Sequence, residues 1–482
     1  MSHVDLVVVG GGITGLAAAW EAHQRGASAV VLERDPHVGG KLRTSVVAGI
    51  PLDESADAFL ARVPEAVGLC AELGLETELI APATGRAYLW SDGRLRPLPE
   101  AQLLGIPTDL EAVAASGILS PEGLERARQD LLHPDDRPAA DRTARDESIG
   151  ELVRRRLGDE VLDRLVAPLV GGIWAGDCDR LSLHAATPAI AEAWARAPSL
   201  IEGAAAMRAA GAAAAARPDG AVQPVFLAPR GGMARLVDAL ADALGDRIRT
   251  GHAVEALAPV GPAGRGRWAV HGVSGAGGGG NAELTADGVV VATPAFAAAS
   301  LVAPHCPPAG ETLAAIEHAS MVMVALAVPR AGIDRPLDGS GFLVPPSSGR
   351  LLTACSWTST KWPHLGSDDG SVVLLRAAAG RAGDDRALHL SDDKLVGALL
   401  ADLADTMSLR AEPVEVRINR WSRSFPQPRP GHLDRIGALE SDLARSAPGL
   451  AAAGAWARGV GLPACIRAGR QAARAALAAL AA

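Results

Sequence analysis

Three glycines near the N-terminus have the spacing of a turn that binds phosphates. Gly10, Gly12 and Gly15 follow the apolar run at 5–9 and precede a segment rich in Ala and Leu. In such a turn the first glycine permits a sharp bend, the second lets the backbone approach a pyrophosphate, and the third lets helix and strand pack closely. Glu33 stands about twenty residues further on, where a carboxylate accepts hydrogen bonds from ribose hydroxyls. The pattern predicts a dinucleotide site but does not distinguish FAD from NAD.

Two further glycine-rich segments bear on the choice of cofactor. Residues 39–44 read Gly-Gly-Lys-Leu-Arg-Thr, and residues 453–463 read Ala-Gly-Ala-Trp-Ala-Arg-Gly-Val-Gly-Leu-Pro. Together with the first turn they resemble the flavin amine oxidase superfamily. In that fold the first segment runs along FAD, and the second returns to the first domain with a helix N-terminus facing the isoalloxazine ring. The resemblance therefore implies FAD, bound non-covalently, rather than NAD.

Within this superfamily the chain resembles the protoporphyrinogen/coproporphyrinogen oxidase family over nearly its whole length. The motifs that carry the resemblance lie at 105–110, 168–177, 180–183, 292–294, 339–345, 361–363, 431–433 and 459–466. Amine oxidases and carotenoid desaturases do not share the middle motifs. The chain is most similar to the soluble enzymes of Gram-positive, especially GC-rich, bacteria, which act on coproporphyrinogen III. The membrane-associated members act on protoporphyrinogen IX.

The resemblance implies a set of FAD contacts, transferred motif by motif. These are Gly10, Gly11, Gly12, Ile13, Thr14, Gly15, Glu33, Arg34, Gly40, Lys41, Arg43, Ser55, Ala56, Asp57, Ala58, Val254, Trp421, Ala455, Val460, Gly461 and Leu462. Two motifs depart from the family. The usual Gly-Pro-Asp-Ser-Phe reads Ser-Ala-Asp-Ala-Phe at 55–59, which keeps the aspartate but loses the glycine-proline turn. A Pro-Gln-Tyr motif reads Pro-Gln-Pro at 426–428, so any role of that tyrosine is absent.

The resemblance also implies a cavity for a flat tetrapyrrole. Arg86 matches an arginine that some members use to pair with a substrate propionate, and a planar guanidinium suits a carboxylate. Gly171, Gly172 and Ile173 would line the cavity, because glycines let the backbone approach a flat ring. Each assignment has a plainer alternative, which is surface charge for Arg86 and an inter-helix turn for the glycines.

The implied reaction is the oxidation of coproporphyrinogen III to coproporphyrin III in haem biosynthesis. FAD would accept six electrons in three two-electron steps, and oxygen would reoxidise it with release of three H2O2. A downstream ferrochelatase is a candidate partner. No Ser-His-Asp or Cys-His pair stands out, so we name no catalytic residue and expect no metal. Lys361 and His432 are candidate polar cavity residues, although a lone lysine or histidine is more often structural.

Three other functions remain open on the sequence. The substrate could be protoporphyrinogen IX, the enzyme could be another amine oxidase or desaturase, or the chain could be a non-catalytic flavoprotein that binds porphyrin. A single tyrosine, Tyr88, and an aromatic content of 3% weigh against the aromatic pair that faces the flavin in amine oxidases.

These motifs require particular elements around them. Residues 5–9, 13–25 and 29–32 predict a strand, helix and strand in a βαβ unit. We expect an α/β fold, with a Rossmann-like FAD-binding domain of the amine-oxidase type, an α+β substrate part with a mixed sheet, and a mostly helical domain. The expected boundaries are 1–85, 222–310 and 435–482 for the FAD-binding domain, 86–205 for the helical domain and 311–434 for the substrate-binding domain.

Composition excludes several other classes. The net charge of −9 argues against a nucleic-acid binder, which shows a basic face. Five scattered cysteines without a CxxC pair predict neither a disulfide framework nor a zinc site, and they favour a reducing cytoplasm. The N-terminus enters a strand almost at once, so we expect no signal peptide. No apolar run reaches the length of a membrane-spanning helix, so we expect no integral membrane segment.

Overall fold

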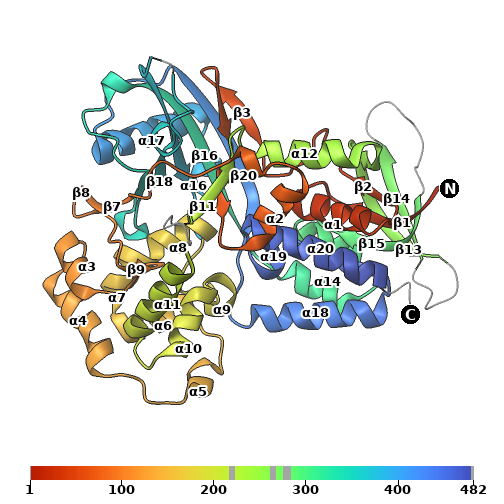
Figure 1. The fold of residues 1–482 in the computed structure, drawn as a ribbon, viewed down its shortest axis with the longest axis horizontal. Helices are drawn as coiled ribbons and strands as arrows, with labels where there is room; N and C mark the ends of the chain where they lie inside the picture. Colours follow the sequence, from red (N-terminus) through yellow and green to blue (C-terminus); the bar gives the residue numbers. More distant parts are fainter. Residues whose placement is uncertain (1, 216–222, 261–266, 275–283, 368, 479–482) are drawn as a thin grey trace.

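Residues 2–215, 223–260, 267–274, 284–367 and 369–478 are described in a computed structural model, and they form three lobes (Figure 1). One lobe contains the N-terminal sheet and its covering helices, a second contains another large sheet, and the third is helical. The α/β fold expected from the sequence is confirmed.

The first lobe is built on a sheet with the order β12-β2-β1-β15-β14-β13, in which β21 also pairs with β15. Its strands are β1 (Ser2–Val9), β2 (Ala29–Leu32), β12 (Ile248–Arg249), β13 (His252–Pro259), β14 (Trp268–Ser274), β15 (Leu284–Val291) and β21 (Leu450–Ala452). The pairs β12–β2, β2–β1, β1–β15 and β15–β21 are parallel, whereas β13 and β14 form an antiparallel extension. Leu6, Val7 and Val8 are fully buried, as expected for a parallel strand covered on both faces.

Helices cover both faces of this sheet. One face packs against α1 (Ile13–Gln24), α2 (Pro64–Glu72), α12 (Ala234–Leu244) and α20 (Leu462–Ala478). The other packs against α13 (Ala295–Val302), α14 (Pro307–Ala314) and α18 (His432–Ser446). The close contact of α1 with α20 depends on Gly469, because a Cβ there would lie 2.0 Å from the Thr14 carbonyl oxygen. The C-terminal helix therefore lies directly against the helix that follows the glycine turn.

The second lobe has a mixed sheet with the order β20-β16-β19-β18-β17-β7-β8. Its strands are β7 (Tyr88–Ser91), β8 (Arg94–Pro97), β16 (His318–Pro329), β17 (Gly341–Leu343), β18 (Leu352–Trp357), β19 (Val372–Ala379) and β20 (Glu415–Pro426). Helix α17 (Asp392–Met407) covers one face, and the hairpin of β3 (Thr44–Val47) and β4 (Ile50–Asp53) covers part of the other.

One expected boundary differs from the structure. We expected residues 86–205 to be a mostly helical domain, yet β7 and β8 within this range belong to the second sheet. The parallel pairing of β7 with β17 joins segments about 250 residues apart, and no local pattern around residue 88 reveals it.

The third lobe contains the helices from α3 to α11. They are α3 (Leu110–Ser116), α4 (Pro121–Leu132), α5 (Ala139–Thr143), α6 (Ile149–Leu157), α7 (Asp159–Val161), α8 (Ala167–Trp174), α9 (Leu183–Ala186), α10 (Pro188–Arg196) and α11 (Leu200–Ala215). A π-helical turn over Leu162–Val166 leads into α8. The lobe has its own core, in which Trp194 and Leu152 are completely buried.

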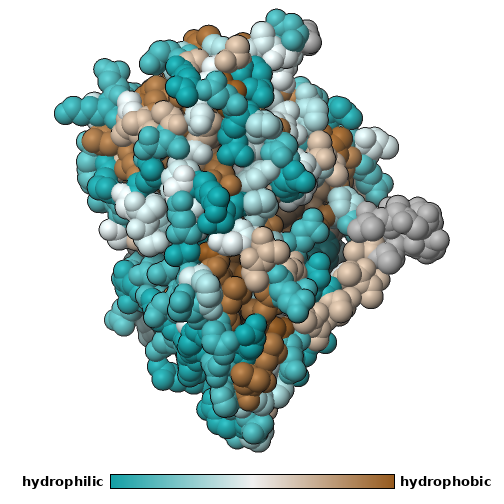
Figure 2. All heavy atoms as spheres, turned by 90° about the vertical axis from the view of Figure 1, so that its left-hand side faces the viewer, coloured by the Kyte–Doolittle hydropathy of each residue, from teal (hydrophilic) through white to brown (hydrophobic). Residues whose placement is uncertain are grey.

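Short strands and short α-helices connect the larger elements. They are β5 (Phe59–Leu60), β6 (Leu79–Ile80), β9 (Gln102–Leu103), β10 (Ile106–Pro107), β11 (Phe226–Pro229), α15 (Thr358–Lys361), α16 (Arg386–His389) and α19 (Ala455–Arg458). Figure 2 shows apolar side chains gathered on one face of the lower, helical lobe. Among the described residues, every helix is too short or too polar to cross a membrane.

Candidate functional site

The glycine turn between β1 and α1 has the shape that the sequence predicts. Gly10 has a φ of +105°, and a Cβ there would lie 2.9 Å from the Ala292 carbonyl oxygen. A Cβ on Gly15 would lie 1.9 Å from the carbonyl oxygen of Gly10. Nothing lies within 4 Å of a Cβ built on Gly12, which begins α1 without a side-chain cap. The turn thus offers open space and free N–H groups at one point, which fits a pyrophosphate.

Glu33 directly follows β2, and its carboxylate holds this turn through hydrogen bonds. Its Oε2 accepts a hydrogen bond from the Gly11 N–H at 2.6 Å, and its Oε1 accepts one from the Asp35 N–H at 2.8 Å. Each carboxylate oxygen has a second lone pair, so ribose hydroxyls can still bind it. Arg34 and Arg43 lie on either side of Asp35, each 3.6 Å from one of its carboxylate oxygens.

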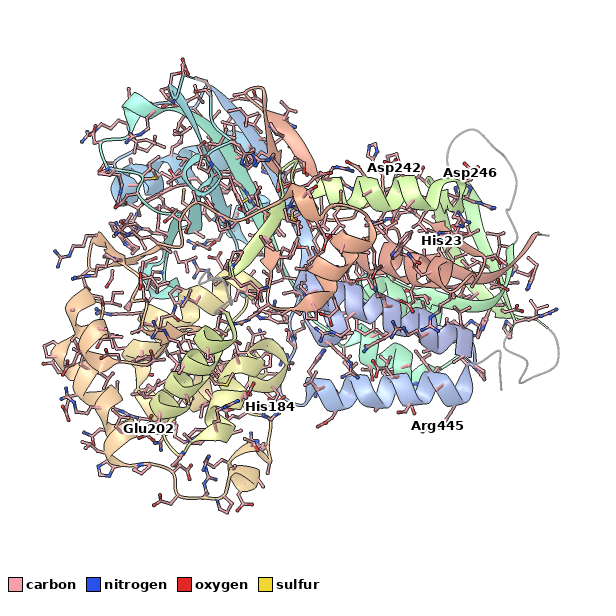
Figure 3. The ribbon with its side chains drawn as sticks, viewed as in Figure 1. His23, His184, Glu202, Asp242, Asp246 and Arg445 are labelled. Atoms are coloured by element: carbon pink, nitrogen blue, oxygen red, sulfur yellow. The ribbon has the colours of Figure 1, made fainter. Side chains whose placement is uncertain are left out.

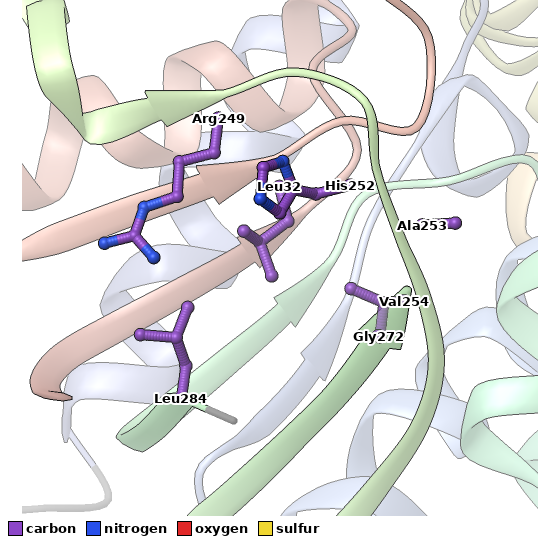
Figure 4. A pocket seen from close by; sticks show the side chains of 7 residues that line it. All are labelled: Leu32, Arg249, His252, Ala253, Val254, Gly272 and Leu284. Carbon is purple, nitrogen blue, oxygen red and sulfur yellow. The ribbon is translucent and has the colours of Figure 1, made fainter. Parts of the chain in front are cut away.

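Val254 lies in β13, close to the end of β2. Together with neighbouring side chains it lines a cavity of about 10 Å³, which is room for a single water (Figure 4). The lining residues are Leu32, Arg249, His252, Ala253, Val254, Gly272 and Leu284. Backbone hydrogen bonds link Glu33 to Arg249 and to His252, so this cavity adjoins the expected ribose position.

The second glycine segment lies against the first. Gly39 N–H donates to the Gly11 carbonyl at 2.8 Å, and a Cβ on Gly40 would lie 3.4 Å from the Gly12 Cα. Lys41 follows, and burial lowers the pKa of its ammonium group. Its Nζ donates to the Ser424 carbonyl at 2.5 Å, which ties this segment to the second sheet.

The loop 54–58 continues the same surface. Ser55 Oγ donates to the Lys41 carbonyl at 2.5 Å, and Trp421 Nε1 donates to the Glu54 carbonyl at 3.3 Å. Ala56 is exposed at the tip of the loop, and Ala58 packs against the core of the first lobe. The structure therefore brings together the segments around Gly40, Ser55 and Trp421, which are far apart in the sequence.

Asp57, in the same loop, is held by two cations. Lys361 Nζ lies 2.9 Å from both of its carboxylate oxygens, and Arg376 Nη1 lies 3.4 Å from Oδ2. Burial alone would raise the pKa of the Asp57 carboxyl, but Lys361 and Arg376 lower it to about 2. Lys361 is therefore engaged in an ion pair rather than free in a cavity.

The C-terminal turn reaches the same region. Ala455 begins the short helix α19, and Trp456 Nε1 donates to the Thr293 carbonyl at 3.1 Å. Val460 packs against the core of the helical lobe, whereas Leu462 is buried in that of the first lobe. Gly461, exposed between them, leads into α20 beside Thr14.

Helix α8 packs against one face of the second sheet, and we call the region between them the slot. Paired residues on neighbouring strands point to the same face of a sheet, because side chains alternate between the two faces along each strand. One such row shares a face of the second sheet and consists of Leu343, Ala354, Ala378, Met323 and Asn419. A Cβ on Gly172 would lie 3.3 Å from Leu343 Cδ2, whereas a Cβ on Gly171 would meet nothing within 4 Å. Ile173 is 43% exposed. Small residues therefore occur on both sides of the slot.

The sequence did not single out the row of slot residues on the second sheet. The only signal is the recurrence of small residues at alternate positions in the predicted strands, and a chain so rich in alanine hides it.

Arg86 lies outside this slot. Its Nη1 pairs with Asp338 Oδ2 at 2.9 Å, and Tyr88 Oη donates to Asp338 Oδ1 at 2.7 Å. The Arg86 side chain is 59% exposed. His432, by contrast, is buried, and its Nε2 lies 2.8 Å from the Trp456 carbonyl and 3.0 Å from that of Ala457. Its contacts are those of a structural histidine.

Within the described ranges, no group of three His, Cys, Asp or Glu side chains could hold a metal ion. His184 lies beside the start of α18 (Figure 3), with Nδ1 3.8 Å from Asp146 Oδ1. All five cysteines are free and buried, and burial raises the pKa of the Cys465 thiol.

Comparison with known proteins identifies similar chains. The family model for flavin containing amine oxidoreductase matches residues 13–477. A coproporphyrinogen III oxidase of Bacillus subtilis is 34% identical over 481 residues, covering 97% of this chain and 96% of the relative. One of Propionibacterium freudenreichii is 35% identical, covering 96% of this chain and 89% of the relative. The crystal structure of a protein assigned as a protoporphyrinogen oxidase, from Exiguobacterium, is 30% identical, with a TM-score of 0.83 and 99% of each chain covered.

Proposed function

The chain belongs to the flavin containing amine oxidoreductase family, and on this basis we propose that it oxidises coproporphyrinogen III. The overall reaction is coproporphyrinogen III + 3 O2 → coproporphyrin III + 3 H2O2. Six hydrogens leave the tetrapyrrole, and each oxygen molecule accepts two electrons and two protons. The reaction belongs to haem biosynthesis.

FAD is the cofactor, and the cradle fits it. The open space at Gly12 and the start of α1 would receive the pyrophosphate, and Glu33 would bind the ribose. Lys41, Ser55 and Trp421 lie along the continuation of this surface. When bound, FAD supplies the electron acceptor that no side chain can provide, and oxygen returns it to the oxidised state.

The observation that carries the substrate assignment is the set of small residues on both sides of the slot, which lies beside this cradle. Ala354 and Ala378 contribute little bulk on one wall, and Gly171 and Gly172 contribute none on the other. Such walls suit a macrocycle that becomes flat as its bridging carbons are oxidised, and the apolar side chains of Leu343 and Met323 would exclude water from those carbons. The coproporphyrinogen III oxidases at 34% and 35% identity support the same substrate class.

The protein side chains position the substrate rather than take part in bond breaking. Asn419 is the polar member of the row on the sheet, and it would donate or accept a hydrogen bond at the macrocycle. Arg86 would attract a propionate at the surface. We assign no side chain as general base, because the step at a bridging carbon removes a hydride, which the cofactor would accept.

Protoporphyrinogen IX is the second candidate substrate. The assigned activity of the Exiguobacterium protein favours it. The two substrates differ in carboxylate number, four against two, so the ratio of their kcat/KM values separates them. A ratio of ten or more in favour of protoporphyrinogen IX would reverse our choice.

Oxygen uptake tests the proposal. Purified protein reconstituted with FAD should consume three oxygen molecules for each coproporphyrin III formed, with porphyrin fluorescence as the second readout. Porphyrin binding without oxygen uptake would favour a non-catalytic flavoprotein. A cytoplasmic location and transfer of the product to a ferrochelatase complete the proposal.

A further inference from the structure

A buried ionic cluster joins the second sheet to the FAD cradle. It consists of Asp57, Lys361 and Arg376, with Trp362 Nε1 donating to Asp57 Oδ2 at 3.3 Å. The side chains of Asp57 and Lys361 are each 18% exposed, and that of Arg376 is 5% exposed. Asp57, Lys361 and Arg376 together carry one net positive charge. Asp53 also lies close to Arg376, and burial raises the pKa of its carboxyl, which favours the uncharged form.

Hydrogen bonds connect this cluster to the glycine turn. Arg376 Nη2 donates to the Ser55 carbonyl, and Ser55 Oγ donates to the Lys41 carbonyl. Lys41 is itself buried, and within the described part of the chain no carboxylate lies at ion-pair distance from it. Hydrogen bonds therefore connect the cluster to the loop that contacts Gly12.

The cluster also lies beside the slot. Arg376 and Ala378 are two residues apart on β19, so their side chains share the face of the sheet that forms one wall of the slot. Ser356 is the cross-strand partner of Arg376, and Ala354 is that of Ala378. The cluster thus borders both the expected cofactor surface and the substrate surface. In addition, Arg376 Nε is buried without a hydrogen-bond partner among the described residues.

We infer that Asp57, Lys361 and Arg376 are positioning residues that also raise the reduction potential of bound FAD. They hold the loop 54–58, and their net positive charge stabilises the negative charge that reduction adds. In each two-electron step, a hydride would pass from the substrate to FAD and one proton would leave the substrate for solvent, so the reduced form of the cofactor would be the more negative one. Partial burial strengthens this interaction, because the surrounding dielectric constant is below that of water. The inference rests on FAD as cofactor and not on the identity of the porphyrinogen.

The reduction potential of the reconstituted protein, measured against a reference dye without substrate, tests this inference. Lys361→Met removes a positive charge and should lower the potential. Asp57→Asn removes a negative charge and should raise it. Each change should alter the reduction equilibrium constant about tenfold, which is about 30 mV for a two-electron couple. Loss of packing alone would not produce shifts of opposite sign.

Two further variants separate charge from position. Lys361→Arg keeps the charge and should leave the potential unchanged. Arg376→Lys keeps the charge but weakens the hydrogen bond to Ser55, so the Kd for FAD should rise about tenfold at unchanged potential. Arg350→Gln is the matched control, because Arg350 forms a 2.8 Å ion pair with Asp402 on the α17 side of the same sheet.

Shifts of the same sign for Lys361→Met and Asp57→Asn, or no shift in either, would overturn the inference. If Asp57→Asn does not retain FAD, the two Lys361 variants decide the question: equal potentials contradict it, and a lower potential only in Lys361→Met supports it. A protein that shows these shifts but does not oxidise coproporphyrinogen III would refute the proposed function and leave the inference intact.

Discussion

The cofactor cradle and the slot beside it take their shapes from different parts of the chain, which are backbone atoms in the cradle and small residues in the slot. In the cradle, backbone atoms fill the space around Gly10 and Gly15 so closely that no side chain fits. In the slot, the shape comes from the small side chains of Ala354 and Ala378 and from Gly171, where an added Cβ would meet nothing within 4 Å. Substitutions in the cradle should therefore abolish FAD binding or folding. Substitutions in the slot should lower the catalytic activity to different extents.

The largest effect should come from Gly15→Ala. The added Cβ would lie 1.9 Å from the Gly10 carbonyl oxygen, which requires a backbone shift and costs about 3 kcal/mol or more. We expect little folded protein and no bound FAD, measured by thermal unfolding and visible absorbance. Gly12→Ala is the matched control, because its Cβ meets no protein atom within 4 Å. It should fold with normal stability and yet bind FAD poorly; normal FAD binding by Gly12→Ala would contradict the placement of the pyrophosphate.

Asp57→Asn should have the next largest effect, on stability. Removing the carboxylate leaves Lys361 and Arg376 buried without their ion-pair partner, at a cost of about 3–5 kcal/mol at neutral pH. The folded pKa of Asp57, about 2, lies below its ordinary value. The contribution of the carboxylate is therefore full above about pH 4 and disappears as the pH falls through 2. The difference in unfolding free energy between the wild type and Asp57→Asn should narrow as the pH falls from 7 to 2. A difference that stays constant would contradict the ion pair.

A bulky residue in the slot should impair catalysis without affecting the cofactor. Ala378→Phe places a ring on the sheet face that packs against α8, so kcat/KM for coproporphyrinogen III should fall about a hundredfold through misplacement of the substrate. FAD content and reduction potential should remain those of the wild type. Val414→Phe, at a position that is 61% exposed, controls for the added size. Unchanged kinetics in Ala378→Phe would exclude this row as the substrate surface.

The smallest effect should come from Arg86→Gln. Its guanidinium is exposed and already paired with Asp338, and exposed ion pairs contribute at most about 1 kcal/mol. We expect KM to rise about two- to fivefold, more at low than at high ionic strength, with kcat unchanged. A loss of kcat would mean that Arg86 reaches the reacting ring and that the slot extends to the surface.

The same contrast explains what the sequence could predict. Local spacing predicts the roles of Gly10, Gly12 and Gly15, because the backbone geometry of a single turn requires all three glycines. The ion pair of Asp57 with Lys361 joins residues 304 positions apart, and no local pattern indicates it. The pairing of β7 with β17 is similarly distant, which is why the expected boundary at residue 86 differs from the structure.

The slot is harder still to recognise in the sequence. Ala354 and Ala378 are ordinary strand residues until the register of β18 and β19 places them side by side. The resemblance to a family indicated Gly171, Gly172 and Ile173 on the helical wall, but the row on the sheet emerged only from the strand pairing. Their roles as substrate contacts, like those of the individual FAD contacts, stay predictions.

The most direct measurement is the visible absorbance of the FAD-loaded protein as coproporphyrinogen III is added without oxygen. We predict that the flavin absorption bleaches at once and that admitting oxygen restores it while porphyrin forms. Flavin absorption that stays unchanged with substrate in excess would contradict the proposed function, although the cradle and its cofactor would stand.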